Sequence, residues 1–193
     1  MVILALYHLK DIQGGINLIV MKKYAKDSLA TMTEMVLPND TNPLHNMMGG
    51  RMMHLMDVVA AIAAQRHSNS IVVTASVDHV SFNSSIKLGN VVTLKAQVTR
   101  SFNSSMEVYI EVWTENIPNN TKEKSNHAFF TFVALDQQGK PIKVPELVPE
   151  TIEETELFDG ALRRRQLRLI LAGKMQAKDA TELQRIFNLS DNS

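Results

Sequence analysis

The sequence predicts an α+β fold in which one long helix lies across one face of an antiparallel sheet. The stretch "RMMHLMDVVAAIAAQRH" (51–67) contains no Pro or Gly and is rich in Ala and Met, which predicts a helix of about five turns. One strand-like run precedes this helix and four follow it, at 29–38, 70–82, 90–102, 105–116 and 125–136. A single helix embedded among strands of this length is typical of a sheet laid around a helix.

The strand-like runs are separated by turn-forming segments. "PNDTNP" (38–43) precedes the helix, and "NSSIKLGN", "NSS" and "IPNNTKEK" join the later runs. The runs 90–102 and 105–116 alternate apolar and polar residues, as expected for a sheet with one buried face. We therefore expect five or six antiparallel strands. One helix covers only one face of such a sheet, so we expect a dimer that joins two sheets edge to edge.

Both ends of the chain lie outside this pattern. Residues 1–20 are apolar but are interrupted by Lys10, Asp11 and two glycines, so no run approaches the roughly 20 residues of a membrane span. They also lack the basic start and small-residue cleavage site of a signal peptide. We expect 1–25 to be an extension without a role in function. The other end, 150–193, predicts an appendage of two helices, at about 151–172 and 176–188.

The composition excludes several classes of protein. Lys plus Arg and Asp plus Glu number 20 each, so the formal net charge is zero, which argues against a nucleic-acid-binding module. The chain has no cysteine, which excludes disulfides, thiolate metal sites and cysteine nucleophiles and is compatible with a reducing cytoplasm. No Gly-x-Ser-x-Gly motif of a serine hydrolase is present. His45 and His54 have no partners at metal-ligand spacing, so we expect no metal site.

The segment "LHNMMGGRMMHLMD" (44–57) carries the strongest signal of chemistry. A Gly within a helix costs about 1 kcal/mol relative to Ala, so Gly49 and Gly50 at the start of the helix indicate a close approach to its backbone. The free amides of a helix N-terminus stabilise negative charge. Asp57 lies seven residues after Gly50, close to two helical turns, and therefore projects on the same side.

Four segments together resemble a known family: "LPNDTNPLHNMMGGRMMHLMDVVAAIAAQRHS", "VVTASVDHVSFNSSIKLGNVVTLKAQV", "SSMEVYIEVW" and "FTFVALDQQGKPIKVP". They look like the hotdog-fold acyl-CoA thioesterases, in the branch of the bacterial and brain acyl-CoA hydrolases. The resemblance implies a hotdog domain at 26–149 that hydrolyses acyl-CoA to free acid and coenzyme A. It also implies no separate cofactor, a cytoplasmic location, and a homodimer with sites at the shared interface, assembled as a hexamer (trimer of dimers).

The resemblance assigns roles to four residues. Gly50, with Gly49 close behind, would donate backbone amides to the thioester oxyanion, although the glycines could instead permit close packing of helix on sheet. Asp57, contributed by the partner subunit, would orient or activate the water. Alternatively, an isolated acid on a helix often pairs with a surface cation. Asn46 would hold the water or carbonyl, although it could be an ordinary turn residue. Asn42 is a weaker candidate for water positioning.

By the same resemblance, the segments 82–90 and 101–108 line a groove for coenzyme A. The neutral hydrogen-bonding side chains and candidate phosphate partners in this groove are Asn83, Ser84, Lys87, Arg100, Ser104 and Ser105. The arginines at 163–165 are further phosphate candidates, or else the solvated face of a helix.

Two readings of function remain: a thioesterase, or a hotdog module that binds acyl-CoA without turnover. A hotdog hydratase is weaker, because its usual loop Asp followed by a His is missing.

Overall fold

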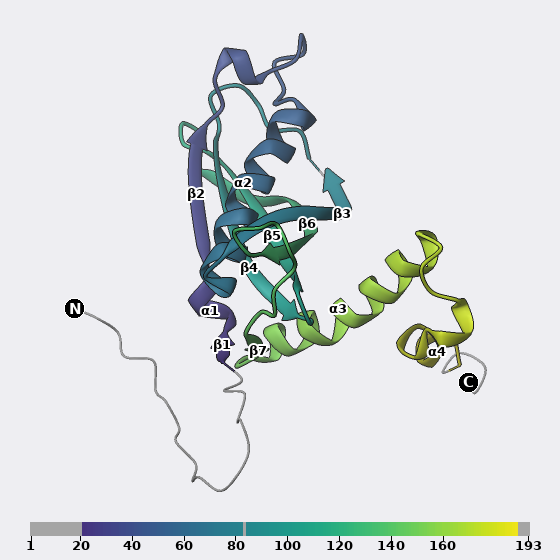
Figure 1. Cartoon of the computed structure of the whole chain (residues 1–193). Helices are drawn as coiled ribbons and strands as arrows, with labels where there is room; N and C mark the ends of the chain where they lie inside the picture. Colours follow the sequence, from purple (N-terminus) through teal and green to yellow (C-terminus); the bar gives the residue numbers. More distant parts are fainter. Residues whose placement is uncertain (1–20, 83, 189–193) are drawn as a thin grey trace, which may run out of the picture.

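The computed structural model describes residues 21–82 and 84–188 (Figure 1). Its elements, in chain order, are β1 (Lys22–Tyr24), α1 (Ala25–Ser28), β2 (Ala30–Met35), the 3-10 turn η1 (Pro38–Asp40), α2 (Gly49–Ser68), β3 (Ile71–Phe82), β4 (Val91–Ser101), β5 (Ser105–Asn116), β6 (Thr121–Leu135), β7 (Glu146–Val148), α3 (Ile152–Leu171), η2 (Ala177–Asp179) and α4 (Thr181–Asn188).

Five strands form one antiparallel sheet in the order β2-β4-β5-β6-β3, and the sheet curves around α2 (Figure 1). β3 and β2 are therefore its two edges. The predicted α+β architecture, a long central helix wrapped by five antiparallel strands, is confirmed. β3 pairs with β6 through two irregularities in register, between Thr74 and Ser76 and between Asp78 and Ser81. Such bulges bend an edge strand and increase its twist.

The core lies between α2 and the inner face of the sheet. The buried face of α2 follows helical spacing, and the sheet contributes alternate residues of its central strands. The main contributors are Met52, Leu55, Met56, Val59, Ala60 and Ala63 from α2, with Leu94, Val108, Ile110, Phe130 and Phe132 from the strands. The Met and Ala residues of the run 51–67 thus supply much of the helix face that packs against the sheet.

The observed bounds differ from the predicted ones in small ways. α2 begins at Gly49, so both glycines belong to its first turn. The first strand ends at Met35, because Asp40 accepts the Leu37 amide at 3.0 Å and starts a 3-10 turn. A parallel pair of β1 and β7 was not predicted. β1 falls within the predicted 1–25 extension, whose residues 1–20 lie outside the described residues.

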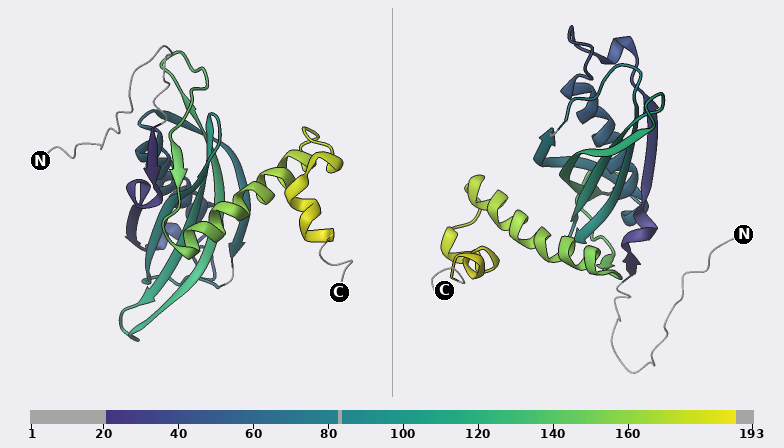
Figure 2. Two further views of the ribbon diagram at one scale, coloured as in Figure 1. Left: turned by 90° about the horizontal axis from the view of Figure 1, so that it is seen from below. Right: turned by 180° about the vertical axis from the view of Figure 1, so that it is seen from behind.

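The C-terminal helices lie apart from the core. α3 crosses the outer face of the sheet, opposite α2, and continues past the β3 edge to α4 (Figure 2). Both helices match the predicted positions within a few residues, apart from the short η2 turn that precedes α4. In the part of the chain that the structure describes, no helix combines the length and apolar character needed to cross a bilayer.

Candidate active site

The N-terminus of α2 is open. Met48 precedes the helix without a side-chain cap, and the first intrahelical bond runs from the Met52 amide to the Met48 carbonyl at 3.1 Å. The amides of Gly49, Gly50 and Arg51 have no acceptor among the described residues. Free amides at a helix start carry partial positive charge and can bind an anion.

The two glycines are not required by packing within the chain. A Cβ added at Gly50 would meet no atom within 4 Å, and one added at Gly49 would make ordinary contact with the Phe82 ring at 3.7 Å. Helix-on-sheet packing was the alternative explanation for these glycines, and neither position supports it. The space over Gly50 is open to a molecule from outside the chain.

Polar contacts fix the loop before α2. The Met48 amide donates to the Asp40 carbonyl at 2.8 Å, and Arg51 forms ion pairs with Asp40 and Glu34 at 2.8 and 2.7 Å. The Leu37 amide and then the Arg51 guanidinium lower the pKa of Asp40 below its ordinary value. Arg51 is thereby held by its own chain. These contacts position the loop without using the free amides.

A cleft of about 340 Å³ opens beside the helix start. Its lining combines polar groups with apolar side chains: Asn46, Met47, Gly49, Met52, Phe82, Ser84, Ser85, Ile86 and Asn126. The Lys87 ammonium donates to Asn46 Oδ1 at 2.6 Å and so adds a positive charge next to the cleft. Of the residues predicted from sequence, the structure thus brings Asn46, Gly49, Ser84 and Lys87 together.

The loop before α2 carries a second side-chain amide, that of Asn42, close in sequence to Asn46. Asn42 Oδ1 accepts the backbone amides of Leu44 and Asn46 at 3.0 and 3.2 Å, which closes a tight turn. His45 within that turn has a positive φ of 55°. The side-chain NH₂ of Asn42 has no acceptor among the described residues, so this residue keeps donor groups for a ligand.

Asp57 is half-buried, and its one hydrogen-bond partner among the described residues lies on the sheet edge: Thr74 Oγ1 of β3 donates to Asp57 Oδ1 at 2.7 Å. Among the described residues Asp57 forms no ion pair, contrary to the alternative that it joins a surface cation. It does not line the cleft of its own chain. Seven residues separate it from Gly50, which is about 10 Å along the helix.

The residues predicted for coenzyme A fall into two groups. Ser84 and Lys87 lie at the cleft, whereas Arg100, Ser104 and Ser105 lie where β4 ends and β5 begins, about 30 Å away along β4. Arg100 donates to the Phe158 carbonyl at 3.0 Å and stacks on its ring, and burial lowers the Arg100 pKa. A single chain does not bring the two groups together. Asn83 lies outside the described residues.

Sequence reasoning missed several cleft and helix partners. Phe82 and Ile86 lie within the segment 82–90 that was predicted to line a groove, but neither was singled out, and Thr74 bonds Asp57 across 17 residues. Asn126 is only 2% exposed and lines the cleft. Its position directly before the largely apolar run "HAFFTFVAL" (127–135) was the available signal. Within the described residues, no three His, Cys, Asp or Glu side chains gather as metal ligands.

Comparison with known proteins decides the family. The family model of the thioesterase superfamily matches residues 44–119. The uncharacterized acyl-CoA thioester hydrolase YkhA of Bacillus subtilis is 41% identical over 142 residues, which cover 74% of this chain and 83% of that protein. The chain belongs to the thioesterase superfamily. The rat cytosolic acyl coenzyme A thioester hydrolase is also 41% identical, over 68% of this chain, but the chain spans only 35% of that protein's length.

Solved thioesterase structures share the fold. A hexameric acyl-CoA thioesterase superposes with a TM-score of 0.77 at 38% identity, over 79% of this chain and 98% of that one. The Staphylococcus aureus acyl-CoA hydrolase, bound to butyryl coenzyme A, coenzyme A and coenzyme A disulfide, gives 0.73 at 36%, over 88% and 99%. Further structures of that hydrolase carry single alanine substitutions of an Asn, of an Asp 15 residues later and of a Thr 17 residues after the Asp.

Proposed function

We propose that this thioesterase hydrolyses acyl-CoA to a free acid and coenzyme A, at a site that two copies complete. The observation that carries the proposal is a triad of residue types at matching spacing. Asn42, Asp57 and Thr74 are separated by 15 and 17 residues, as are the Asn, Asp and Thr replaced in the Staphylococcus aureus hydrolase. The 2.7 Å bond between Thr74 and Asp57 supports a common role for this pair.

The spacing favours Asn42 over Asn46 as the loop amide of the reaction. Asn46 shares the cleft, but its Oδ1 is occupied by Lys87. Asn42 has its oxygen fixed by two backbone amides, which leaves its NH₂ group oriented and available. We assign Asn42 to hold the attacking water or the thioester carbonyl, and Asn46 with Lys87 to bind the substrate.

The free amides of α2 supply the oxyanion site. When water attacks a thioester, the carbonyl oxygen gains a full negative charge, and preorganised amides stabilise that charge more than they stabilise the neutral carbonyl. The open space over Gly50 supports its amide as the main donor, with Gly49 beside it. An Ala at either position would introduce a methyl group where the substrate approaches.

Asp57 acts as the general base in this scheme. Its carboxylate takes one proton from water as the water oxygen bonds to the thioester carbon, and the electrons of the C=O bond move to the oxygen. Collapse of the oxyanion reforms C=O and breaks the C–S bond, and the thiolate of coenzyme A recovers the proton from Asp57. Thr74 keeps the carboxylate oriented throughout. Coenzyme A is part of the substrate, so the reaction uses no separate cofactor.

The β3 edge supports a site shared between copies. Among the described strands β3 pairs only with β6, and Ile71, Val73 and Val77 are exposed along this edge strand. In an antiparallel pairing of two copies centred near Val77, Thr74 would face the Phe82 end of the partner's strand. Phe82 lines the cleft. Asp57 of one copy would then stand at the cleft of the other, which its own chain does not allow.

The relatives support a proposal for the assembly and the location. We propose a homodimer as the smallest active unit, further assembled as a trimer of dimers, on the strength of the hexameric relative. The name of the rat relative supports a cytosolic location. The two groups of coenzyme A residues, far apart in one chain, would contribute to different sites or to neighbouring copies.

Release of free thiol from a panel of acyl-CoA esters tests the activity directly. The wild type should release one thiol per acid formed, and the Asp57→Asn variant should release thiol at least a hundredfold more slowly. Binding of acyl-CoA without thiol release, by a folded wild-type protein, would instead make the chain a binding module.

A further inference from the structure

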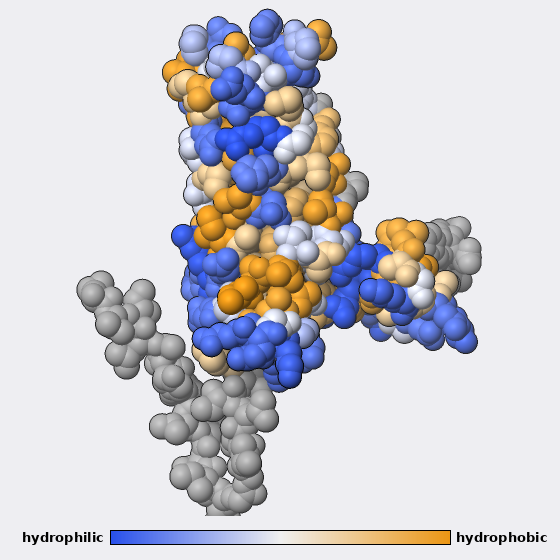
Figure 3. Space-filling model, turned by 45° about the horizontal axis from the view of Figure 1, so that its top comes forward, coloured by the Kyte–Doolittle hydropathy of each residue, from blue (hydrophilic) through white to orange (hydrophobic). Residues whose placement is uncertain are grey.

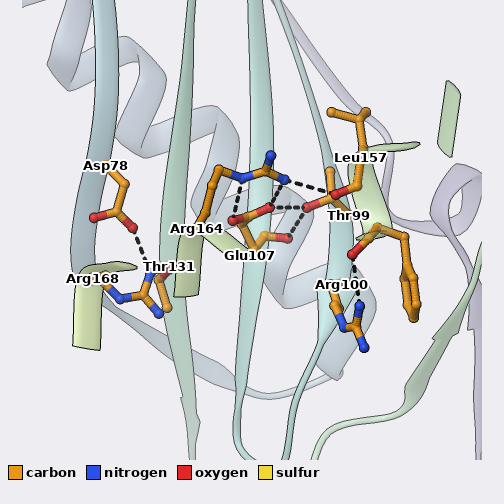
Figure 4. A network of polar contacts seen from close by, with 9 residues as sticks. Asp78, Thr99, Arg100, Glu107, Thr131, Leu157, Arg164 and Arg168 are labelled. Carbon is orange, nitrogen blue, oxygen red and sulfur yellow. Dashed lines mark hydrogen bonds and ion pairs between the residues drawn. The ribbon is translucent and has the colours of Figure 1, made fainter. Parts of the chain in front are cut away.

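One helix spans most of the outer face of the sheet. Going along α3, Phe158 contacts Arg100 of β4, Arg164 binds Glu107 of β5, and Arg168 binds Thr131 of β6 and Asp78 of β3 (Figure 4). This is the order of the strands in the sheet. From Phe158 to Arg168 the helix rises about 15 Å, and three strand spacings amount to about 14 Å. α3 therefore reaches the β3 edge at Arg168.

The side of α3 that faces the sheet continues beyond that edge. Its members recur at helical spacing of three and four residues: Leu157, Gly160, Ala161, Arg164, Arg168 and Leu171. Those above the sheet are engaged, with Ala161 fully buried and Arg164 paired to the buried Glu107 at 2.7 Å. Leu171, the last member, is 79% exposed because the sheet ends beneath it.

The projecting end is an ordered arm. Gln166 is buried, and its side-chain oxygen accepts the amides of Glu182 and Leu183 at 3.0 and 3.2 Å, which fixes the start of α4 to α3. Ala180 is buried between them. The arm stands clear of the body of the molecule and carries apolar side chains next to charged ones (Figure 3). We call α3 from Arg168 onward, with α4, the C-terminal arm.

We infer that the C-terminal arm packs on the outer face of the sheet of a second copy, across the joined β3 edges. The inference rests on the edge-to-edge dimer of the proposed function. Leu171 lies three residues beyond Arg168, a rise of about 4.5 Å, and a paired strand would lie about 4.8 Å beyond β3. Leu171 would therefore stand over the partner's β3.

The surface that the arm would meet is apolar. Ile71 and Val73 pair directly with Leu135 and Val133 of β6, whose neighbours Phe132 and Ala134 point into the core. Ile71 and Val73 therefore face outward, and both are exposed in one chain. A second copy thus offers exposed aliphatic side chains beneath an exposed Leu. The arm would tie each subunit to its partner at the edge that completes the catalytic site.

Two positions on the same helix give a matched test. Leu171→Glu introduces a charge at the inferred contact, and Ile152→Glu introduces the same charge at a side chain that is 78% exposed but lies at the other end of α3. Dimer dissociation is followed by sedimentation on dilution, with circular dichroism as the check on folding. Leu171→Glu should raise the dissociation constant of the dimer at least tenfold, and Ile152→Glu should change it less than twofold.

The cysteine-free chain permits a direct contact test as well. One copy carries Leu171→Cys and the other Val73→Cys, so a short bismaleimide can join this pair only between copies. Cross-linking in the mixed dimer supports packing of the C-terminal arm on the partner's sheet.

If a stable dimer forms with neither cross-linking nor an effect of Leu171→Glu, the inference fails while the proposed dimer stands. If Leu171→Glu only splits a hexamer into intact dimers, the arm joins dimers and the inference is also wrong. A wild type that never dimerises would overturn the proposed shared site itself.

Discussion

Two acidic side chains in this thioesterase have opposite surroundings. Glu107, on the outer face of β5, is only 2% exposed and is saturated by Thr99 and by two nitrogens of Arg164. Asp57, on α2, is half-buried, and its one hydrogen-bond partner in the described part of the chain is the neutral hydroxyl of Thr74. A carboxylate whose oxygens are all engaged by its own chain stabilises the fold, whereas one with spare acceptor capacity is free to serve a reaction. The same contrast separates the fixed outer face under α3 from the open start of α2.

The largest expected effect is on turnover by Asp57→Asn. The substitution keeps size and the ability to accept from Thr74 but removes the base, so kcat should fall at least a hundredfold. The melting temperature should change by less than 2 °C, about 1 kcal/mol or less, because no ion pair is lost. Steady-state thiol release measures kcat, and thermal unfolding measures the melting temperature. Near wild-type kcat would remove Asp57 from the mechanism.

For Glu107→Ala we expect the opposite, a loss of stability with little change in turnover. It leaves Arg164 without its buried partner, at a cost of about 3 kcal/mol. For a chain of this size that lowers the melting temperature by roughly 6 to 12 °C, with kcat of the folded protein within about twofold. Glu115→Ala, on the same strand, is the control, since its carboxylate is exposed and lies 3.4 Å from Lys122. Loss of turnover without loss of stability at Glu107 would contradict the division between the two regions.

The loop before α2 offers a matched pair of amides. Asn42→Ala should lower kcat about tenfold or more with little change in KM, because its hydrogen bond serves the transition state. Asn46→Ala should act mainly on KM, because Asn46 lies in the cleft with Lys87. Comparing the two sets of kinetic constants decides between them. If kcat responds to Asn46 instead, the spacing argument for Asn42 is wrong.

A smaller effect distinguishes two helix glycines. Gly50→Ala meets no neighbouring atom, so it should keep or raise stability by up to about 1 kcal/mol while kcat/KM falls a few-fold through crowding of the substrate. At Gly160 an added Cβ would lie 2.6 Å from an Arg164 nitrogen, so Gly160→Ala should disturb α3 and leave kcat alone. Unchanged kcat/KM for Gly50→Ala would mean that nothing approaches the helix start.

Local patterns in the sequence predicted the elements but not the contacts between distant ones. The composition and spacing of 51–67 predicted α2, and the alternation in 90–102 and 105–116 predicted β4 and β5, since burial of one face imposes these periods. The Glu107–Arg164 clamp joins residues 57 apart, and no local period signals it. Two amides in one loop, Asn42 and Asn46, could not be ranked from residue type. Asp57 was predicted as a candidate from its place on the helix, but its partner Thr74 looked like any strand threonine.

The shared site is the central claim, and complementation between inactive variants tests it most directly. Asn42→Ala and Asp57→Asn are purified separately, dissociated, mixed in equal amounts and reassociated, and thiol release is measured. If each site takes Asn42 from one copy and Asp57 from the other, half of the dimers are mixed, and each mixed dimer has one intact site and one doubly altered site. Activity should then recover to about one quarter of wild type. No recovery, with mixing demonstrated by differently tagged copies, would mean that the two residues act within one chain.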